Sequence, residues 1–166
     1  MRFVLFAALA ALAACATMGQ SGPSLRYADA ASRGTLASFF AGRPSERQVE
    51  HATEAWTGAL RDSFACGVRM RDVVNAGLAG ALEIGAMNAA ASGGGEDEVR
   101  AGVVRYVAQF AGLALERRER PSEARCDMLA AWAPRIAEDG REAVERARRN
   151  GLMDDDYGLL LDLLGN

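Results

Sequence analysis

The chain has 166 residues, of which half are apolar and a quarter charged, a length and composition that suit one globular domain with a sizeable core. Its formal net charge is −3, so the chain lacks the broad positive charge with which proteins bind nucleic acid. We therefore expect no nucleic-acid partner. Ala, Gly and Leu dominate over the β-branched and aromatic residues that strands prefer. We therefore predict an all-α fold, a single helical bundle of five to seven helices.

The N-terminus begins with Met-Arg and continues as an unbroken apolar run over residues 3–14. A run of roughly a dozen residues is too short to cross a ~30 Å hydrocarbon layer as a permanent helix. It has the length of the hydrophobic region of a signal peptide. We therefore interpret the run as a leader for export.

Leu12-Ala13-Ala14-Cys15 follows the order of small residues and cysteine that closes a lipoprotein leader, and it resembles the bacterial lipobox. The resemblance implies cleavage before Cys15 and attachment of a diacylglyceryl group to its thiol. Ala16, where enteric lipoproteins of the inner membrane carry Asp, favours the outer membrane, facing the periplasm. An ordinary secretory leader that happens to contain a cysteine is the alternative. The expected organisation is a signal peptide (1–14), the lipidated cysteine with a flexible tether (15–24) and a helical domain (25–166).

From Ser24 onward the apolar positions recur at helical spacing. We expect a first helix over 24–41, ended by Gly42-Arg43-Pro44, with Leu25, Ala28, Leu36, Phe39 and Phe40 facing inward. A second helix begins at Ser45, which forms a capping box with Gln48. Its continuation past Gly67 or a break near Arg71-Asp72 both remain open.

The third predicted helix, 73–91, carries a stripe of small residues at four-residue intervals: Gly77, Ala81, Gly85 and Ala89. Such a stripe allows another backbone to approach closely, and in membranes it drives helix association. An ionised Glu83 would be costly inside a bilayer. We therefore favour a central helix of a water-soluble bundle over a membrane-inserted segment.

Three glycines end that helix, and the acidic residues 96–98 begin the next. We expect its buried face to contain Val99, Val103, Tyr106, Val107, Phe110, Leu113 and Ala114. A fifth helix over 122–138 should be bent or split at Pro134, and a separate Arg-rich helix should lie between Gly140 and Gly151. After the aspartates 154–156, a last segment is expected to pack Leu160, Leu161 and Leu164 against the domain.

Cys66 and Cys126 remain once Cys15 is lipidated, and an exported compartment is oxidising. We predict that they form a disulfide, which would close a loop of about 60 residues worth roughly 4 kcal/mol in the chain-entropy model. Two separate buried thiols are the alternative. The sequence contains no C-x-x-C motif, so it gives no indication of a redox centre.

His51 is the single histidine, too few imidazoles for a typical metal site or a convincing catalytic triad with Ser63. The aspartates 154–156 lack the pattern of an EF-hand loop and are better explained as helix capping. Glu50, Glu54 and Glu83 could converge in a cleft and supply the paired carboxylates of a hydrolase. Many other pairs of acidic residues could do so equally well. We therefore name no catalytic residue and expect no metal or cofactor.

Without a catalytic constellation, the pattern favours a lipid-anchored cell-envelope protein that acts through protein contacts, as a structural, assembly or inhibitory factor. Its expected partners are the membrane, through the lipid on Cys15, and an envelope protein. A helical module that binds an apolar ligand or lipid, in a pocket between the Gly/Ala-striped helix and aromatic neighbours, is the main alternative. An envelope hydrolase is a third.

Overall fold

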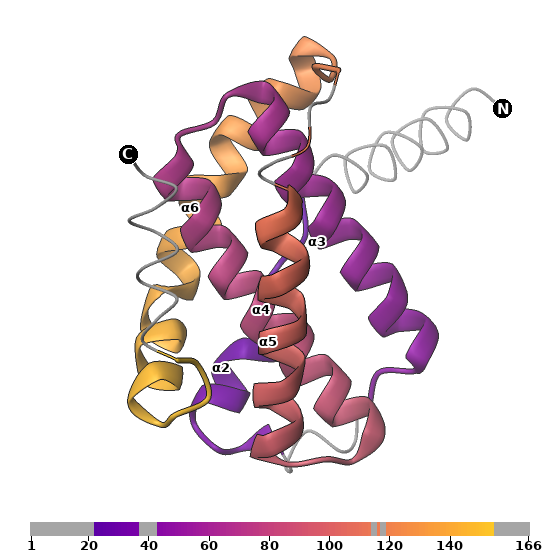
Figure 1. The fold of residues 1–166 in the computed structure, drawn as a ribbon, viewed down its shortest axis with the longest axis vertical. Coiled ribbons are helices and arrows are strands. Elements are labelled where there is room, and N and C mark those ends of the chain that lie inside the picture. Colours follow the sequence, from indigo (N-terminus) through magenta and orange to yellow (C-terminus); the bar gives the residue numbers. More distant parts are fainter. Residues whose placement is uncertain (1–21, 37–42, 114–115, 117–118, 155–166) are drawn as a thin grey trace, which may run out of the picture.

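The computed structural model describes residues 22–36, 43–113, 116 and 119–154 of the chain. Across these residues it contains helices and no strand, which confirms the all-α prediction, and Figure 1 shows the helices gathered in one bundle. The helices are α2 (Ala28–Ser32), α3 (Glu46–Cys66), α4 (Met70–Ser92), α5 (Glu96–Leu113) and α6 (Glu123–Arg149).

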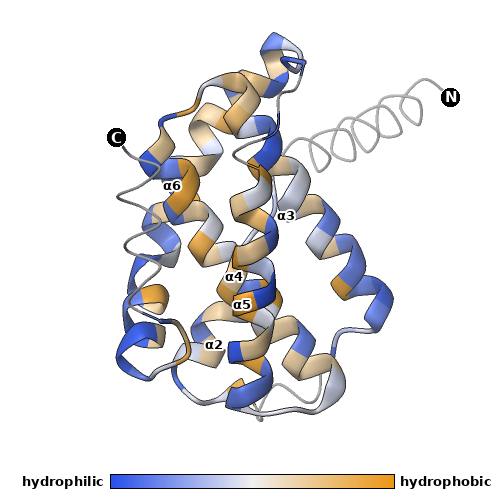
Figure 2. Ribbon diagram, in the orientation of Figure 1, coloured by the Kyte–Doolittle hydropathy of each residue, from blue (hydrophilic) through white to orange (hydrophobic). Residues whose placement is uncertain are grey.

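Helix α4 is the centre of the bundle, buried on all its sides over most of its length. Gly80 lies against the Trp56 ring of α3, and Ala79 lies against Gly140 of α6. Figure 1 shows α5 running directly in front of α4, with α3 alongside. In Figure 2 the hydrophilic residues of α3 and α6 gather on their outer sides. Helix α4 is in contact with α2, α3, α5 and α6. A helix surrounded in this way needs small side chains, which is why this segment is rich in Gly and Ala.

The predicted stripe of small residues faces α5 and brings the two backbones together. A Cβ atom at Gly85 would lie 2.7 Å from the backbone oxygen of Val99, and a Cβ at Gly102 would lie 2.7 Å from the Cα of Gly85. Neither position can hold a larger residue without a shift of backbone. The described residues include no helix long and apolar enough to span a membrane.

Aromatic side chains fill the space around α4. Trp56 and Trp132 are tilted against each other with ring centroids 5.6 Å apart, and Phe64 stacks on Phe110 at 5.7 Å. The Phe110 ring also covers Gly77. The Trp56 and Phe110 rings thus pack directly against glycines of the striped helix, Gly80 and Gly77.

Helix α3 begins at the predicted capping box. The Ser45 hydroxyl accepts the backbone N–H of Gln48, and the Gln48 side chain accepts the backbone N–H of Ser45 at 2.8 Å. The helix ends at Gly67, whose φ of +74° suits a glycine in the left-handed region. This settles the open question of its length: the helix stops before Arg71-Asp72.

The first predicted helix, 24–41, is wrong in the part that the structure describes. Only Ala28–Ser32 are helical, and Gly34 follows with a φ of +67°. Residues 22–25 have no regular secondary structure, and Arg26 and Tyr27 form a bend in which their backbone N–H groups bond to Glu83 of α4. Phe39 and Phe40 lie outside the described residues.

The expected break at Pro134 and the separate Arg-rich helix are also wrong, because α6 runs unbroken from Glu123 to Arg149. A proline inside a helix costs about 3 kcal/mol or more, so burial of side chains on both sides of it must offset that cost. Trp132, Ala133 and Ile136 are nearly fully buried there. Gly140 lies within the same helix because its missing side chain makes room for Ala79.

The buried face predicted for α5 is confirmed from Val99 to Leu113, and Ala114 lies outside the described residues. The predicted disulfide between Cys66 and Cys126 is present, with the Cα atoms 5.3 Å apart. It joins the end of α3 to the beginning of α6. The Asp62–Arg125 ion pair, with Oδ2 and Nη2 3.2 Å apart, links the same two helices beside it.

Candidate functional site

The described chain begins as an extended segment, residues 22–27, that is fixed to the bundle by a buried carboxylate. Glu83 of α4 is 2% exposed. Its Oε2 accepts the backbone N–H groups of Tyr27 at 2.7 Å and Ala28 at 2.8 Å, and both of its oxygens lie 2.9 Å from the N–H of Arg26. These are the free donors at the start of α2. Glu83 therefore caps α2 from a helix far away in sequence.

A tryptophan holds the other end of the same segment. The Nε1–H of Trp132 in α6 donates to the backbone oxygen of Pro23 at 2.8 Å. Gly22 lies so close to this ring that a Cβ would be 2.6 Å from the indole. The segment is thus held to α4 by Glu83 and to α6 by Trp132.

Helix α2 is tied in turn to the end of α6. Asp29 forms an ion pair with Arg146, whose Nε also donates to the Ser32 hydroxyl at 3.2 Å. The side chain of Asn150 donates to the backbone oxygen of Ser32 at 3.0 Å. The whole stretch from Gly22 to Ser32 is therefore part of the rigid domain.

Burial raises the pKa of Glu83 above its ordinary value of 4.5, and the backbone donors of Ala28, Arg26 and Tyr27 oppose this rise by stabilising the ionised form. A hollow of about 270 Å³ adjoins Glu83 and includes Trp56, Met87 and Gln48 in its walls. The backbone N–H groups of three consecutive residues bond to this carboxylate, which therefore holds the chain against α4.

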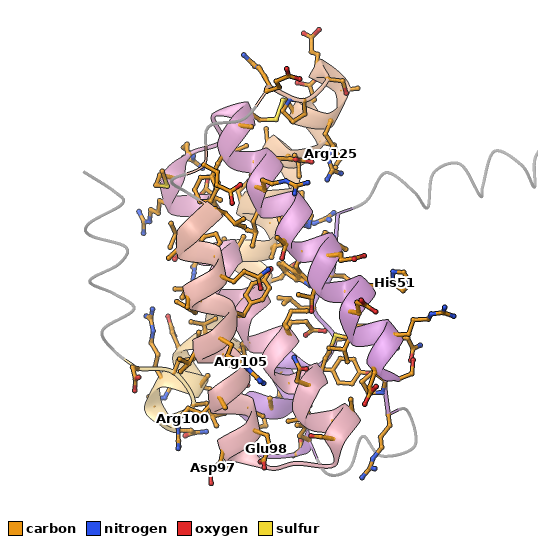
Figure 3. All side chains as sticks on the ribbon, turned by 45° about the vertical axis from the view of Figure 1, so that its right-hand side comes forward. His51, Asp97, Glu98, Arg100, Arg105 and Arg125 are labelled. Carbon is orange, nitrogen blue, oxygen red and sulfur yellow. A yellow bond between two sulfur atoms is a disulfide. The ribbon has the colours of Figure 1, made fainter. Side chains whose placement is uncertain are left out.

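The three carboxylates considered for hydrolysis do not converge. Glu50 and Glu54 line a different hollow, of about 430 Å³, between α3 and the end of α4, while Glu83 is buried beneath the N-terminal segment. His51 is 71% exposed and lies 3.7 Å from Glu54. Figure 3 shows it pointing away from the bundle. His51 itself does not line this hollow, although its neighbours Glu50 and Glu54 do.

The other residues considered for a catalytic or metal site are Ser63, the acidic residues and the cysteines. The Ser63 hydroxyl is buried and donates to the backbone oxygen of Ala59 at 2.7 Å, one turn earlier in its own helix. Among the described residues, no group of His, Cys, Asp and Glu is placed to hold a metal ion. Cys15 and the aspartates 155 and 156 lie outside the described residues.

Sequence reasoning missed the role of Glu83 as a cap and that of Trp132 as a donor to the N-terminal segment. The signal for Glu83 was present, since it is an isolated acidic residue in a run of Gly, Ala, Leu and Ile. A buried charge needs hydrogen-bond partners, but nothing in the pattern said that residues 26–28 would supply them.

Comparison of the chain with protein-family models, with curated proteins and with solved structures found no match. Its function has to be inferred from its own residues.

Proposed function

We propose that the chain is a lipoprotein of the bacterial cell envelope, cleaved before Cys15 and anchored by lipid on that cysteine, whose helical domain acts through protein contacts at the membrane surface. The observation that carries the proposal is the Cys66–Cys126 disulfide. Disulfides persist in oxidising compartments such as the periplasm. With these two cysteines bridged, Cys15 is the one cysteine of the sequence left for lipid attachment.

The attachment of the N-terminal segment also supports an anchoring role. Residues 16–21 separate Cys15 from Gly22, the first residue whose contacts with the bundle the structure describes. An extended chain spans at most about 3.3–3.6 Å per residue. A lipid on Cys15 would thus hold Gly22 within about 25 Å of the membrane. A force on the anchor would be transmitted to α4 through Glu83 and to α6 through Trp132.

The exposed surface favours polar contacts with a partner. Among the described residues, Val104 is the single large apolar side chain that is exposed, so no broad apolar patch marks an obligate interface there. The outer side of α6 instead alternates acidic and basic residues, among them Arg135, Glu138, Asp139 and Glu145. Contacts made by such a surface would be charged and sensitive to salt.

The test is the intact mass of the full chain extracted from a bacterial membrane, before and after thiol alkylation. We expect a mass that begins at Cys15 with added acyl groups, and two alkylated thiols that appear after reduction. The Cys15→Ser variant should lose the acyl mass and leave the membrane fraction. A double variant, Cys66→Ser with Cys126→Ser, is the matched control and should keep the lipid.

An unprocessed chain, or a processed chain that starts at another residue and carries no lipid, would overturn the proposal. Free thiols at Cys66 and Cys126 without reduction would remove its main support. If the anchor is present, crosslinking from exposed α6 positions in intact cells should then capture an envelope protein, and capture should weaken at high salt.

A further inference from the structure

A hollow of about 200 Å³ lies between the first half of α4 and the second half of α6, away from the N-terminal segment. Its apolar lining is contributed by Leu78, Ala137 and Val144. Its polar lining is unusually basic for a chain of negative net charge, and consists of Arg71, Asn75, Arg141, Glu145 and Arg148.

Two of these arginines have no acidic partner in the part of the chain that the structure describes, namely Arg71 and Arg148. Arg141 pairs with Glu138, which does not line the hollow. Arg71 lies in the first turn of α4, where the N-terminal end of the helix dipole adds positive potential. The three guanidinium groups outnumber the one carboxylate of the lining, Glu145, by two, and because Arg141 also pairs with Glu138, a surplus of one positive charge remains.

The Nε–H group of Arg148 is buried and has no hydrogen-bond acceptor among the described residues. Buried donors are almost always satisfied, so this Nε–H is a donor for which the described residues supply no acceptor. The neighbouring exposed arginine, Arg149, does not line the hollow. Position 148 thus differs from its neighbour in two respects, because Arg148 lines the hollow and its Nε is buried, whereas Arg149 is exposed.

We propose that the hollow binds a phosphate group through Arg71, Arg141 and Arg148, with the Asn75 amide as a further donor. Planar guanidinium groups match pairs of phosphate oxygens. Near neutral pH a phosphomonoester carries about −1.5 to −2 charge and a phosphodiester about −1, so either neutralises the unpaired charge of the lining and offers oxygens to more than one guanidinium group. A single carboxylate would engage one guanidinium and leave the others unpaired. The phosphate could belong to a small phosphate ester or to the headgroup of an anionic lipid.

The experiment uses the processed chain, which begins at position 15, with Cys15→Ser, so that neither the apolar leader nor an attached lipid contributes to membrane binding. Inorganic phosphate is titrated at constant ionic strength and followed by calorimetry and by phosphorus NMR. In a second arm the protein is mixed with vesicles of phosphatidylglycerol or of phosphatidylcholine. The test variant is Arg71→Gln with Arg148→Gln, and the control is Arg149→Gln, which removes the adjacent exposed charge.

We expect saturable binding of phosphate or of phosphatidylglycerol vesicles, weakened at least tenfold in the double variant and less than twofold in the control. Binding of free phosphate would identify a small ester, and binding restricted to phosphatidylglycerol would identify a headgroup. If the double variant fails to fold, the single change Arg71→Gln, at an exposed position, replaces it. The proposal is overturned if neither probe saturates, or if Arg149→Gln weakens binding as much as the test variant does.

Discussion

The carboxylate of Glu83 in α4 accepts the backbone N–H of Tyr27 at 2.7 Å, although 56 residues separate the two in sequence. This contact fixes the start of α2 on the central helix. It also fixes the direction in which the chain enters the domain from its N-terminal side. Because Glu83 receives donors from three consecutive residues, its substitution should affect both global stability and the order of this segment.

Replacing Glu83 with Gln should lower the free energy of unfolding by about 1–3 kcal/mol, since the amide turns an N–H₂ group toward backbone donors that lose an acceptor. Urea unfolding followed by circular dichroism measures the change. Hydrogen exchange should show faster exchange at residues 26–28 than in the wild type. The control Glu50→Gln removes the same charge from an exposed position and should alter stability by less than about 0.5 kcal/mol.

The pH dependence of stability should carry the signature of a buried carboxyl group at position 83. Its folded pKa is raised above 4.5 by burial, so between 4.5 and the folded pKa the folded chain holds a proton that the unfolded chain has released. Stability therefore falls as the pH rises through this interval and is constant beyond it. The difference in unfolding free energy between wild type and Glu83→Gln isolates this group from the other carboxylates. A difference that grows with pH would mean that the backbone donors outweigh burial.

The close contact of α4 and α5 should not tolerate a methyl group. Gly85→Ala places a Cβ 2.7 Å from the backbone oxygen of Val99, and the required shift should cost about 1–3 kcal/mol. Gly58→Ala is the matched control, because it lies inside α3 with no atom within 4 Å of the new Cβ. That change should stabilise the protein by roughly 0.5–1 kcal/mol through helix propensity. Thermal unfolding of the two variants compares them directly, and equal effects would refute the packing argument.

Removal of the disulfide by Cys66→Ser with Cys126→Ser should cost about 2–5 kcal/mol, because the bridge closes a loop across a sequence separation of 60. Reduction of the wild-type chain should lower its melting temperature by a similar free energy and should leave the variant unchanged. A variant as stable as the oxidised wild type would show that the Asp62–Arg125 ion pair and the core already define this end of the bundle.

The local pattern of the sequence was sufficient for features whose cause is local. The capping box of Ser45 and Gln48, the acidic start of α5 and its buried face from Val99 to Leu113 follow from hydrogen bonds and periodicity within one helix. The small-residue stripe of α4 also predicted close helix packing correctly, because the absence of side chains has the same consequence in any bundle.

Tertiary contacts determined two features that the local sequence pattern did not predict correctly, the unbroken α6 and the conformation of the segment before α2. Pro134 and Gly140 indicate an interruption when α6 is considered alone, yet burial of Trp132 and Ile136 keeps the helix intact. The segment before α2 has helical periodicity, but its free N–H groups bind Glu83 instead of continuing a helix.

Sequence alone was sufficient to predict the class of fold and the disulfide, since composition and cysteine count are properties of the chain in any conformation. The lipid anchor on Cys15 stays a prediction from a contiguous motif. Only the tertiary structure could bring Glu83 to residues 26–28, Trp132 to Pro23, and Arg71 to the same hollow as Arg148. Such pairings depend on how whole helices cross, and the crossing is set by the packing of many side chains at once.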